Sequence, residues 1–519
     1  MEERIKGPKI RVGLLENEEV VEFTTTSDFR MVTPDGKVVA QGSGGQRWQV
    51  KVLTGKLGQV GYRLLVNSTP ERREAEQIQA DLKDRGFGSI IQNKGKRVLV
   101  ADQEITDNRV YQVYLKDVFR SQENAELYLN SVRGDIEADI QPYYLGQPEG
   151  RLLIRNLDRR QEFEFLEPVK IAGTIVTLKN VKTGEGFHYE GREDRAYRGE
   201  IEFRIGTQGR VTVINELPVE DYLRGVVPSE MGANFPLEAL KAQAVAARGN
   251  VLRKIGLQHQ EQGFDVCDEV HCQVYGGISK ETENTNQAVA ATRGLVLKYA
   301  GKLCDATFFS VCGGHTENSE NVWSGEPVAY LRGVLDSDHK GLRSLGTILT
   351  QEDKVRNWIE GRPDVYCNSQ TNDLPPALDF TKKYFRWEVK YAREELSRII
   401  WKETGQKFGQ LVDILPLKRG VSGRLLAIEI KGTLKSFKIE KELAIRKALS
   451  ETYLYSSCFV VEKRGQQNGL PMEFILKGAG SGHGVGMCQT GAAGMALEGK
   501  KFDEILRHYY TGVELVTVY

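Results

Sequence analysis

The sequence predicts a multi-domain α+β protein. The chain has 519 residues, enough for several domains with separate hydrophobic cores. Short strand-like runs of alternating apolar and polar residues recur through about the first 200 positions. From about residue 201 onward, Ala-rich helical segments and glycine-rich loops follow. We therefore expect a β-rich C-terminal domain with packed helices, preceded by smaller units.

The composition excludes several classes of protein. Lys+Arg and Asp+Glu both number 71, so the formal net charge is zero and no global charge favours nucleic acid or anionic lipid. Hydrophobic residues make up 40% of the chain, but no apolar run approaches the roughly 20 residues that span a bilayer. Seven cysteines are too few for a dense disulfide framework. The charged start, Met1 to Lys6, lacks an apolar signal region, so the protein is either cytosolic or was separated from a signal peptide.

The order of patterns divides the chain into four units. Residues 1–56 read as short strands, beginning with the alternating run Ile10 to Leu15. Residues 57–140 mix strands with helices, and residues 141–200 read as a β-rich linker domain. Residues 201–519 form the fourth unit, with an insertion at about 340–470.

The second unit has the order strand, helix, strands, helix, with a final strand before residue 140. Its first helix is expected to follow Thr69 as N-cap, with Pro70 at the first helical position and Gly86 after its end. Ser121 caps the second helix. Between them, Ser89–Ile91 and Arg97–Val100 are predicted to form a hairpin. This βαββαβ order resembles a SPOR domain, a small fold that binds peptidoglycan glycan chains; an unrelated ferredoxin-like module is the alternative.

Glu230 is the first candidate catalytic residue. Pro218 begins a short helix with an apolar face, and Pro228 is expected to break it. Glu230 follows immediately among apolar neighbours, where a carboxyl group tends to have a raised pKa, as a general acid requires. A solvated glutamate at a helix end is the alternative.

The next helix, residues 236–250, is rich in alanine and places two polar residues in a packing surface. Gln243 and Arg248 are these residues, and both are candidates for substrate binding. Arg248 could orient a sugar or pair with Glu230; an ordinary surface arginine is the alternative.

Cys267, His271 and Cys272 place three metal-ligand side chains within six residues. Zinc prefers such ligands, so the segment predicts a structural zinc site. Buried free thiols or a Cys267–Cys272 disulfide are the alternatives. The fourth ligand is sought further along the chain, among Cys312, His315 and Cys488.

Two later loops carry the remaining candidates. The Gly-Gly turn after Cys312 leads to His315 and Trp323, which suggests sugar stacking by the indole and, less strongly, a cysteine nucleophile. The glycine-rich segment 478–494 lacks the Gly-Lys-Ser/Thr ending of a phosphate-binding loop. It places His483 and Gln489 near the start of a helix, where they could bind a ligand; a purely structural turn is the alternative.

Six of these segments, taken in order, resemble the SpoIID/LytB family over roughly residues 200–516. They are Leu217-Pro-Val-Glu-Asp-Tyr-Leu, Val227-Pro-Ser-Glu-Met, Leu240-Lys-Ala-Gln-Ala-Val-Ala-Ala-Arg, Cys272-Gln-Val-Tyr-Gly-Gly, Phe309-Ser-Val-Cys-Gly-Gly-His-Thr and Gly482-His-Gly-Val-Gly-Met-Cys-Gln-Thr-Gly-Ala. One departure is Gly249-Asn250, where many members have Thr-Tyr, so the resemblance does not predict how the helix packs at these two positions.

The resemblance implies a peptidoglycan lytic transglycosylase with Glu230 as the catalytic acid, acting outside the cytoplasm at the cell wall. It places Arg248 at a position proposed to matter for activity. It also implies that the metal at Cys267, His271 and Cys272 is structural, so that no cofactor serves catalysis. The expected partners are peptidoglycan glycan strands, with other cell-wall hydrolases as further candidates. Two rival hypotheses are a non-catalytic, glycan-binding enhancer of an amidase and a zinc hydrolase.

Overall fold

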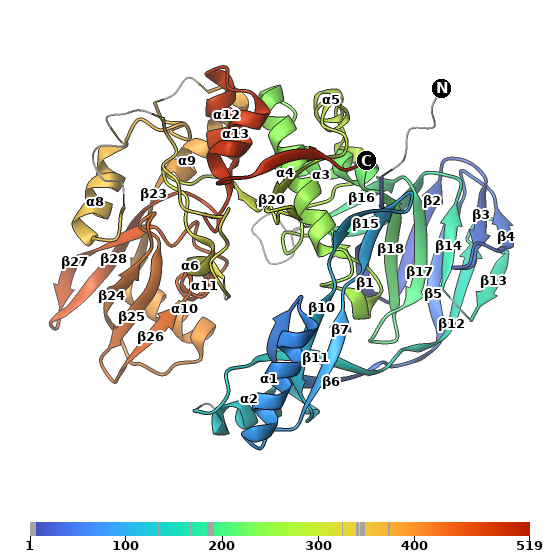
Figure 1. Cartoon of the computed structure of the whole chain (residues 1–519), viewed down its shortest axis with the longest axis horizontal. Coiled ribbons are helices and arrows are strands. Elements are labelled where there is room, and N and C mark those ends of the chain that lie inside the picture. Colours follow the sequence, from blue (N-terminus) through green and yellow to red (C-terminus); the bar gives the residue numbers. More distant parts are fainter. Residues whose placement is uncertain are drawn as a thin grey trace.

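The computed structural model describes residues 7–132, 134–166, 168–183, 191–323, 325–338, 342, 348–371 and 374–519. The predicted α+β class is confirmed, since helices and several separate sheets occur in distinct units. Figure 1 shows a β-rich part, a small unit below it, a central group of helices and a second β-containing lobe. No helix among the described residues is long and apolar enough to cross a membrane.

Two stacked sheets form the β-rich part. A seven-stranded sheet has the order β19-β1-β18-β17-β14-β3-β4, and a six-stranded sheet has the order β13-β12-β5-β2-β15-β16. Buried aromatic rings such as Phe23, Trp48 and Phe203 fill the space between them. The strands are β1 (Lys9–Glu18), β2 (Val20–Thr25), β3 (Phe29–Val32), β4 (Val38–Gly42), β5 (Arg47–Lys56), β12 (Glu149–Asn156), β13 (Glu162–Phe165), β14 (Val169–Ala172), β15 (Val176–Thr183), β16 (Gly191–Tyr197), β17 (Glu200–Ile205), β18 (Val211–Pro218) and β19 (Val266–Cys267).

This arrangement joins chain segments that the sequence pattern had separated. Strands from residues 1–56 and from residues 141–200 share both sheets, and β1 pairs along its length with β18 of the fourth unit. The two stretches are therefore one domain, with the second unit inserted between β5 and β12. Strand pairing across some 200 residues leaves no local sequence signal, which is why the pattern suggested separate units.

The inserted unit has a four-stranded sheet, order β11-β6-β10-β7, with both helices packed against it. Ser121 caps α2 as expected, by accepting a hydrogen bond from the Asn124 N–H. The predicted hairpin is wrong: β7 pairs with β10, while β8 pairs with β9 in a separate ribbon. The first helix begins two residues later than expected, after Glu71. The elements are β6 (Gln59–Thr69), α1 (Arg72–Asp84), β7 (Ser89–Lys94), β8 (Arg97–Val100), β9 (Gln103–Asp107), β10 (Val110–Leu115), α2 (Gln122–Ser131) and β11 (Asp139–Gly146).

The central helices carry the motifs of the fourth unit. Helix α4 is buried along most of its length and contacts α3, α5, α12 and α13. Contrary to the prediction, Pro228 does not break α3, which continues for two more residues to Glu230; the proline removes one backbone N–H donor, and the helix ends within one turn of it. These elements are α3 (Val219–Glu230), α4 (Leu237–Lys254), α5 (Glu283–Ala291), β20 (Leu295–Tyr299), β21 (Lys302–Leu303), β22 (Phe308–Phe309), α6 (Ser319–Val322), β29 (Met487–Cys488), α12 (Gln489–Leu497), α13 (Phe502–Tyr509) and β30 (Glu514–Thr517), with 3-10 turns at Gln260–Gln262 and Ile278–Lys280.

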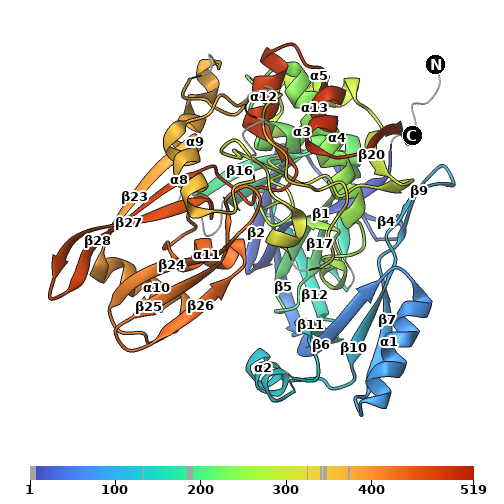
Figure 2. The same cartoon turned by 60° about the vertical axis from the view of Figure 1, so that its left-hand side comes forward.

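Residues of the predicted insertion form the second lobe, which has its own apolar core. Figures 1 and 2 both show it projecting to one side of the central helices. Its core includes Leu396, Phe408, Ile428 and Phe474. The elements are α8 (Glu352–Gly361), a 3-10 helix (Pro376–Thr381), α9 (Lys382–Phe385), β23 (Arg386–Ala392), α10 (Arg393–Thr404), β24 (Leu411–Arg419), β25 (Leu425–Gly432), β26 (Ser436–Glu440), α11 (Glu442–Ala448), β27 (Phe459–Gln467) and β28 (Leu470–Ala479).

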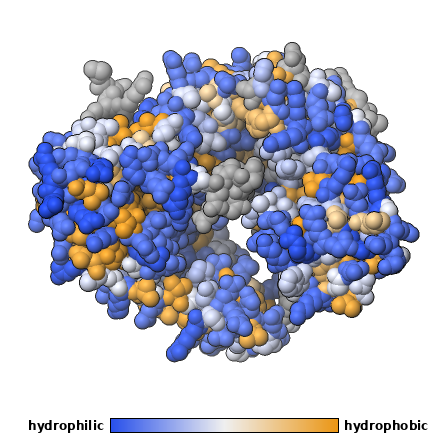
Figure 3. Space-filling view, turned by 180° about the vertical axis from the view of Figure 1, so that it is seen from behind, coloured by the Kyte–Doolittle hydropathy of each residue, from blue (hydrophilic) through white to orange (hydrophobic). Residues whose placement is uncertain are grey.

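The surface is mostly hydrophilic on the face opposite to that of Figure 1. Figure 3 shows apolar residues there in several separate patches and a hollow near the centre of the face. No single apolar surface dominates this view.

Candidate active site and metal centre

Glu230 ends α3, and its partly exposed side chain meets two other segments of the chain. The Val274 N–H donates a hydrogen bond to Glu230 Oε1 at 3.0 Å, and the Gln489 side chain lies beside the same carboxyl group. Burial raises the pKa of Glu230, and these two groups together with the charge of Lys254 offset that rise only in part. Among the described residues, no other carboxylate contributes to this shift. Glu230 is therefore a carboxyl group in surroundings that favour its protonated form.

Gln489 and Gln243 lie together beside Glu230. Gln489 is the first residue of α12, and its Nε2 lies 3.4 Å from Gln243 Oε1 on α4. Gln243 is fully buried, and its Nε2 has no hydrogen-bond partner in the described structure. The prediction that Gln243 contacts substrate is therefore not supported; its position suits holding Gln489 toward Glu230.

His483 is held as a neutral ring next to an exposed indole. Its Nε2–H donates to Phe308 O at 3.0 Å, and its Nδ1 accepts from the Val485 N–H at 3.1 Å. Burial lowers the pKa of His483 to about 3, so the ring does not act as an acid near neutral pH. The Trp323 ring centroid lies 5.1 Å from that of His483, and Trp323 is 40% exposed. These rings form an aromatic surface of the kind on which a sugar can stack.

Arg248 does not lie where the sequence suggested. Its side chain is completely buried and pairs with Glu220 through two hydrogen bonds of 2.8 and 2.9 Å, not with Glu230. Arg248 also donates to Leu295 O, and the Tyr519 hydroxyl donates to the Glu220 carboxylate. Arg248 therefore joins α3, α4, β20 and the C-terminal segment and cannot touch a substrate.

Replacing Arg248 by methionine should destabilise the fold strongly. The change leaves the buried carboxylate of Glu220 without its cation, which costs about 3–5 kcal/mol in comparable buried pairs. Urea unfolding followed by circular dichroism measures the loss. The control Arg224→Met removes a half-exposed arginine on α3 and should change the unfolding free energy by about 0.5 kcal/mol or less. Equal effects of the two variants would contradict this role.

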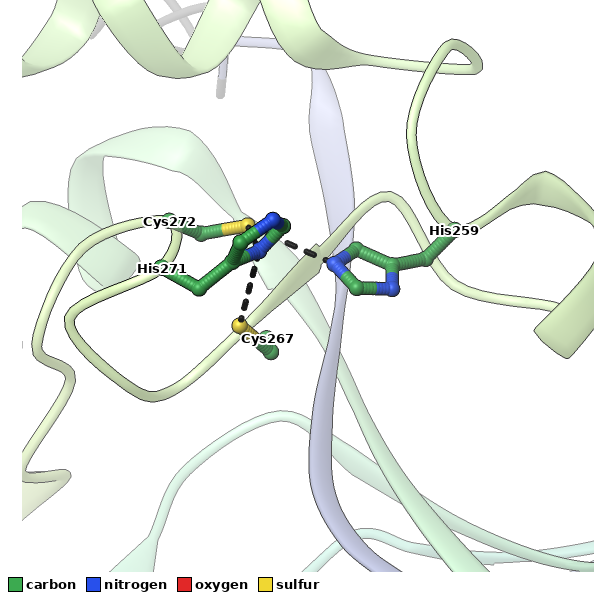
Figure 4. A group of neighbouring side chains, drawn as sticks. All are labelled: His259, Cys267, His271 and Cys272. Carbon is green, nitrogen blue, oxygen red and sulfur yellow. Dashed lines mark hydrogen bonds between the residues drawn. The ribbon is translucent and has the colours of Figure 1, made fainter. Parts of the chain in front are cut away.

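A second group of polar side chains lies in the loop after α4. Cys267, His271, Cys272 and His259 place one ligand atom each within 4.8 Å of the others. Figure 4 shows the four side chains pointing toward one another. Cys272 Sγ lies 3.4 Å from His271 Nδ1 and 3.5 Å from His259 Nε2, and Cys267 Sγ lies 3.8 Å from His271 Nδ1.

These distances fit a tetrahedral zinc ion. Zn–S and Zn–N bonds of about 2.3 and 2.0 Å give S···N edges of about 3.5 Å. The second nitrogen of His259 lies 2.6 Å from Gln262 Oε1, which is the outer partner that a metal-bound imidazole usually has. The hydrogen bond from Cys267 lowers the pKa of Cys272 to about 7, which favours the thiolate.

The fourth residue of the cluster, His259, could not be assigned from the pattern of the other three. His259 lies eight residues before Cys267. This short separation, in a chain with only seven histidines, was the signal in the sequence that could have assigned it to the cluster. The candidates Cys312, His315 and Cys488 are wrong for this cluster. His315 is buried with its Nδ1 2.7 Å from Thr316 O, and the two cysteines belong to another group. The burial of Cys312 also argues against its role as a nucleophile.

The Cys/His cluster and Glu230 are connected through a short piece of backbone. Val274, whose N–H donates to Glu230, follows Cys272 by two residues. Lys254, at the end of α4, donates to Cys272 O at 3.1 Å. Gln273, between Cys272 and Val274, donates to Ala247 O and Asn250 Oδ1 on α4. The cluster therefore fixes the amide group that faces the candidate acid.

The departure Gly249-Asn250 is compatible with tight packing of α4. A Cβ atom at Gly249 would lie 3.2 Å from Cys304 O, and Asn250 donates to Asp305 on the other side. The small residue lets the chain at Cys304 approach the helix closely.

Comparisons with known proteins define the class of protein to which this fold and site belong. A family model described as stage II sporulation protein matches residues 207–299, which include Glu230 and the Cys/His cluster, and a domain of unknown function matches residues 317–486. The stage II sporulation protein D of Bacillus subtilis is 30% identical over 316 residues, covering 58% of this chain and 75% of that protein. The chain belongs to the stage II sporulation protein D family.

Two other relatives extend the comparison. A protein of Brachyspira hyodysenteriae with no assigned function is 34% identical over 335 residues, covering 64% of this chain and 75% of the relative. The amidase enhancer of Bacillus subtilis is 31% identical over 370 residues, covering 68% of this chain. The match spans 48% of the enhancer, so about half of that protein has no counterpart in the aligned region.

Proposed function

We propose that this protein is a peptidoglycan lytic transglycosylase that acts outside the cytoplasm, with Glu230 as its general acid and base. The observation that carries the proposal is the Glu230 carboxyl group, partly exposed at the end of α3, with a raised pKa and a hydrogen bond from the Val274 N–H. Membership in the family supports a role connected with the cell wall.

The reaction needs a single carboxyl group. Protonated Glu230 donates its proton to the glycosidic oxygen between N-acetylmuramic acid and N-acetylglucosamine, and the bond from that oxygen to the muramic C1 breaks. The resulting carboxylate then accepts the proton of the muramic 6-hydroxyl, whose oxygen bonds to the same C1. The product is a 1,6-anhydro sugar, no water is consumed, and Glu230 returns to its protonated form.

The need for one carboxyl group rather than two distinguishes this reaction from hydrolysis. Hydrolysis of a glycoside normally uses two carboxyl groups about 5 to 10 Å apart. In the described structure, no second carboxylate influences the pKa of Glu230. The Trp323 and His483 rings and the Gln489 amide would contact the sugar rings.

We also propose that His259, Cys267, His271 and Cys272 hold a structural zinc ion. Four protein ligands complete a tetrahedron and leave no position for water, which argues against the zinc hydrolase hypothesis. When bound, the ion would supply rigidity to the loop that presents the Val274 N–H.

The rate should depend on pH through the acid form of Glu230. A general acid must be protonated in the starting complex, and its raised pKa keeps it protonated above the ~4.3 typical of glutamate. We expect kcat/KM to stay constant at acidic pH and to fall as pH rises through that raised pKa. Release of soluble muropeptides by the purified protein alone, measured across pH, tests both the activity and the expected fall of kcat/KM at higher pH. A rate that instead rises with pH would contradict the role of general acid.

The inserted unit is proposed to be a SPOR-like glycan tether. On the sheet face away from its helices, the Arg63 guanidinium lies 3.9 Å from the centre of the half-buried Tyr143 ring, above the buried Tyr114. Tethering to the wall would raise the local substrate concentration.

Deleting the inserted unit should weaken wall binding and spare activity on soluble glycan oligomers. Lys56 and Glu149 are paired neighbours in adjacent strands, so a short turn can replace residues 57–148. Binding is measured by co-sedimentation with intact sacculi. Asn108 of this unit also donates to Leu252 O and Ile255 O at the end of α4, a contact that the deletion removes. Asn108→Ala in the full chain removes the same contact but keeps the rest of the unit, so it is the matched control. Equal losses on sacculi and on oligomers would contradict the tether.

A non-catalytic enhancer of an amidase is the second candidate function. The observation that favours it is the similarity to the amidase enhancer over 68% of this chain. An enhancer would release no soluble product by itself but would accelerate a cell-wall amidase added to the same sacculi.

A further inference from the structure

Four buried side chains from well-separated segments converge between the central helices and the second lobe. They are Cys312, Asp336, Cys367 and Cys488, and their ligand atoms all lie within 4.8 Å of one another. None of the four residues is more than 2% exposed. We propose that they form a second metal site, which binds one zinc-like, thiophilic divalent cation through three thiolates and one carboxylate.

The spacing of the ligand atoms is suitable for one ion. Cys312 Sγ and Cys367 Sγ lie 3.3 Å apart, farther than a disulfide bond but close to the S···S edge of about 3.8 Å in a zinc tetrahedron. Thiolate-rich sites select zinc and other soft metals over magnesium or calcium. Four protein ligands leave no open position, so the metal would be structural.

The charge of the cluster also favours a cation. Asp336 is completely buried, and the hydrogen bonds to its carboxylate come from the Cys367 N–H at 2.8 Å and the Tyr509 hydroxyl at 2.5 Å. Arg386 lies nearby, but its guanidinium donates to backbone carbonyls, including Gly313 O at 3.1 Å. No salt bridge to Asp336 occurs within the described ranges. A carboxylate beside three thiols in a dry core is costly unless a positive charge compensates it, and a divalent ion supplies that charge.

Backbone N–H groups already surround the sulfur atoms. Cys488 Sγ accepts from the Cys312 N–H at 3.1 Å and from the Gly491 N–H at 3.3 Å, and Cys312 Sγ accepts from the Gly314 N–H at 3.3 Å. Gly314 has a φ of +109°, which a residue with a side chain rarely adopts, and this conformation folds the turn back over Cys312. Such donors stabilise metal-bound thiolates in the same way that outer partners orient metal-bound histidines.

The position of Cys488 links this site to Glu230. Cys488 is the N-cap of α12, and the side chain of the next residue, Gln489, lies beside Glu230. The two clusters would therefore fix two residues beside Glu230 separately: Cys272 precedes Val274, and Cys488 precedes Gln489. This consequence for catalysis rests on the proposed function, whereas the metal site does not.

The test is the metal content of the purified full-length chain, prepared with zinc under reducing conditions and measured by native mass spectrometry and elemental analysis. We expect two zinc ions per wild-type chain. Cys367→Ser should lose one ion, Cys267→Ser should lose the other, and Cys304→Ser, which changes a buried cysteine outside both clusters, should lose neither.

A second measurement keeps the proposal testable if Cys367→Ser does not fold. Cobalt bound to the folded Cys267→Ser variant should give the charge-transfer band of a site with three thiolates. A single ion in the wild-type chain that is lost in Cys267→Ser, a Cys367→Ser chain that keeps as many ions as the wild type, or a Cys312–Cys367 disulfide in peptides of the purified protein would each overturn the proposal. None of these results depends on enzymatic activity, so failure of this site and failure of the proposed function are distinguishable.

Discussion

Replacing Glu230 by glutamine is expected to reduce the release of anhydro-muropeptides by about 10²- to 10⁴-fold, the range by which a positioned acid or base accelerates a reaction. Glutamine has nearly the same shape and can still accept the hydrogen bond from the Val274 N–H, but it has no proton to transfer to the glycosidic oxygen. Turnover of purified sacculi, measured as soluble muropeptides per enzyme, quantifies the loss.

The same variant should fold at least as well as the wild type. Burial raises the pKa of Glu230, so the folded state favours its neutral form and loses stability as pH rises through that pKa. Glutamine stays neutral, and the variant should therefore unfold at an equal or higher urea concentration at neutral and alkaline pH. Glu283→Gln, at an exposed position at the start of α5, is the matched control and should keep full activity. A Glu230→Gln chain that is stable and fully active would contradict the mechanism.

Removing a ligand of the Cys/His cluster is expected to have the second large effect. Cys267→Ser should release the zinc ion and lower the free energy of unfolding by on the order of 3 kcal/mol, because loss of a structural metal is among the most destabilising changes. Activity should fall as well, since the loop that holds the Val274 N–H against Glu230 loses its anchor.

The shape of the pH profile separates this effect from general unfolding. The Val274 N–H lowers the pKa of Glu230, so its displacement should move the falling limb of kcat/KM to higher pH in the fraction that remains folded. His259→Ala should behave in the same way, because His259 is the fourth ligand, whereas Cys304→Ser should not. A Cys267→Ser chain with unchanged stability and pH profile would contradict the structural role of the metal.

The position of the candidate carboxyl group and most of the Cys/His cluster could be predicted because their signals are local. Glu230 stands at a helix end among apolar residues, and three of the four ligands lie within six positions of the chain. His259 and the Val274 amide were not predicted, for different reasons. The histidine comes from a separate turn before the cluster, and a backbone donor leaves no mark in the sequence.

Arg248 shows the opposite error. A polar residue in an apolar helix suggests a ligand contact, but here its partner is Glu220, 28 positions earlier in the chain. Only the packing of α3 against α4 reveals that the two charges satisfy each other. Likewise, Cys312, Asp336, Cys367 and Cys488 are too far apart in sequence for any motif to unite them.

The most direct test of the central claim is mass spectrometry of the products that the purified wild-type protein releases from peptidoglycan, with Glu230→Gln in parallel. The account predicts 1,6-anhydro-muropeptides from the wild type and almost none from the variant. Products with free reducing ends would instead mean hydrolysis with a second carboxylate, and no soluble product from either chain would contradict catalysis and favour the enhancer function.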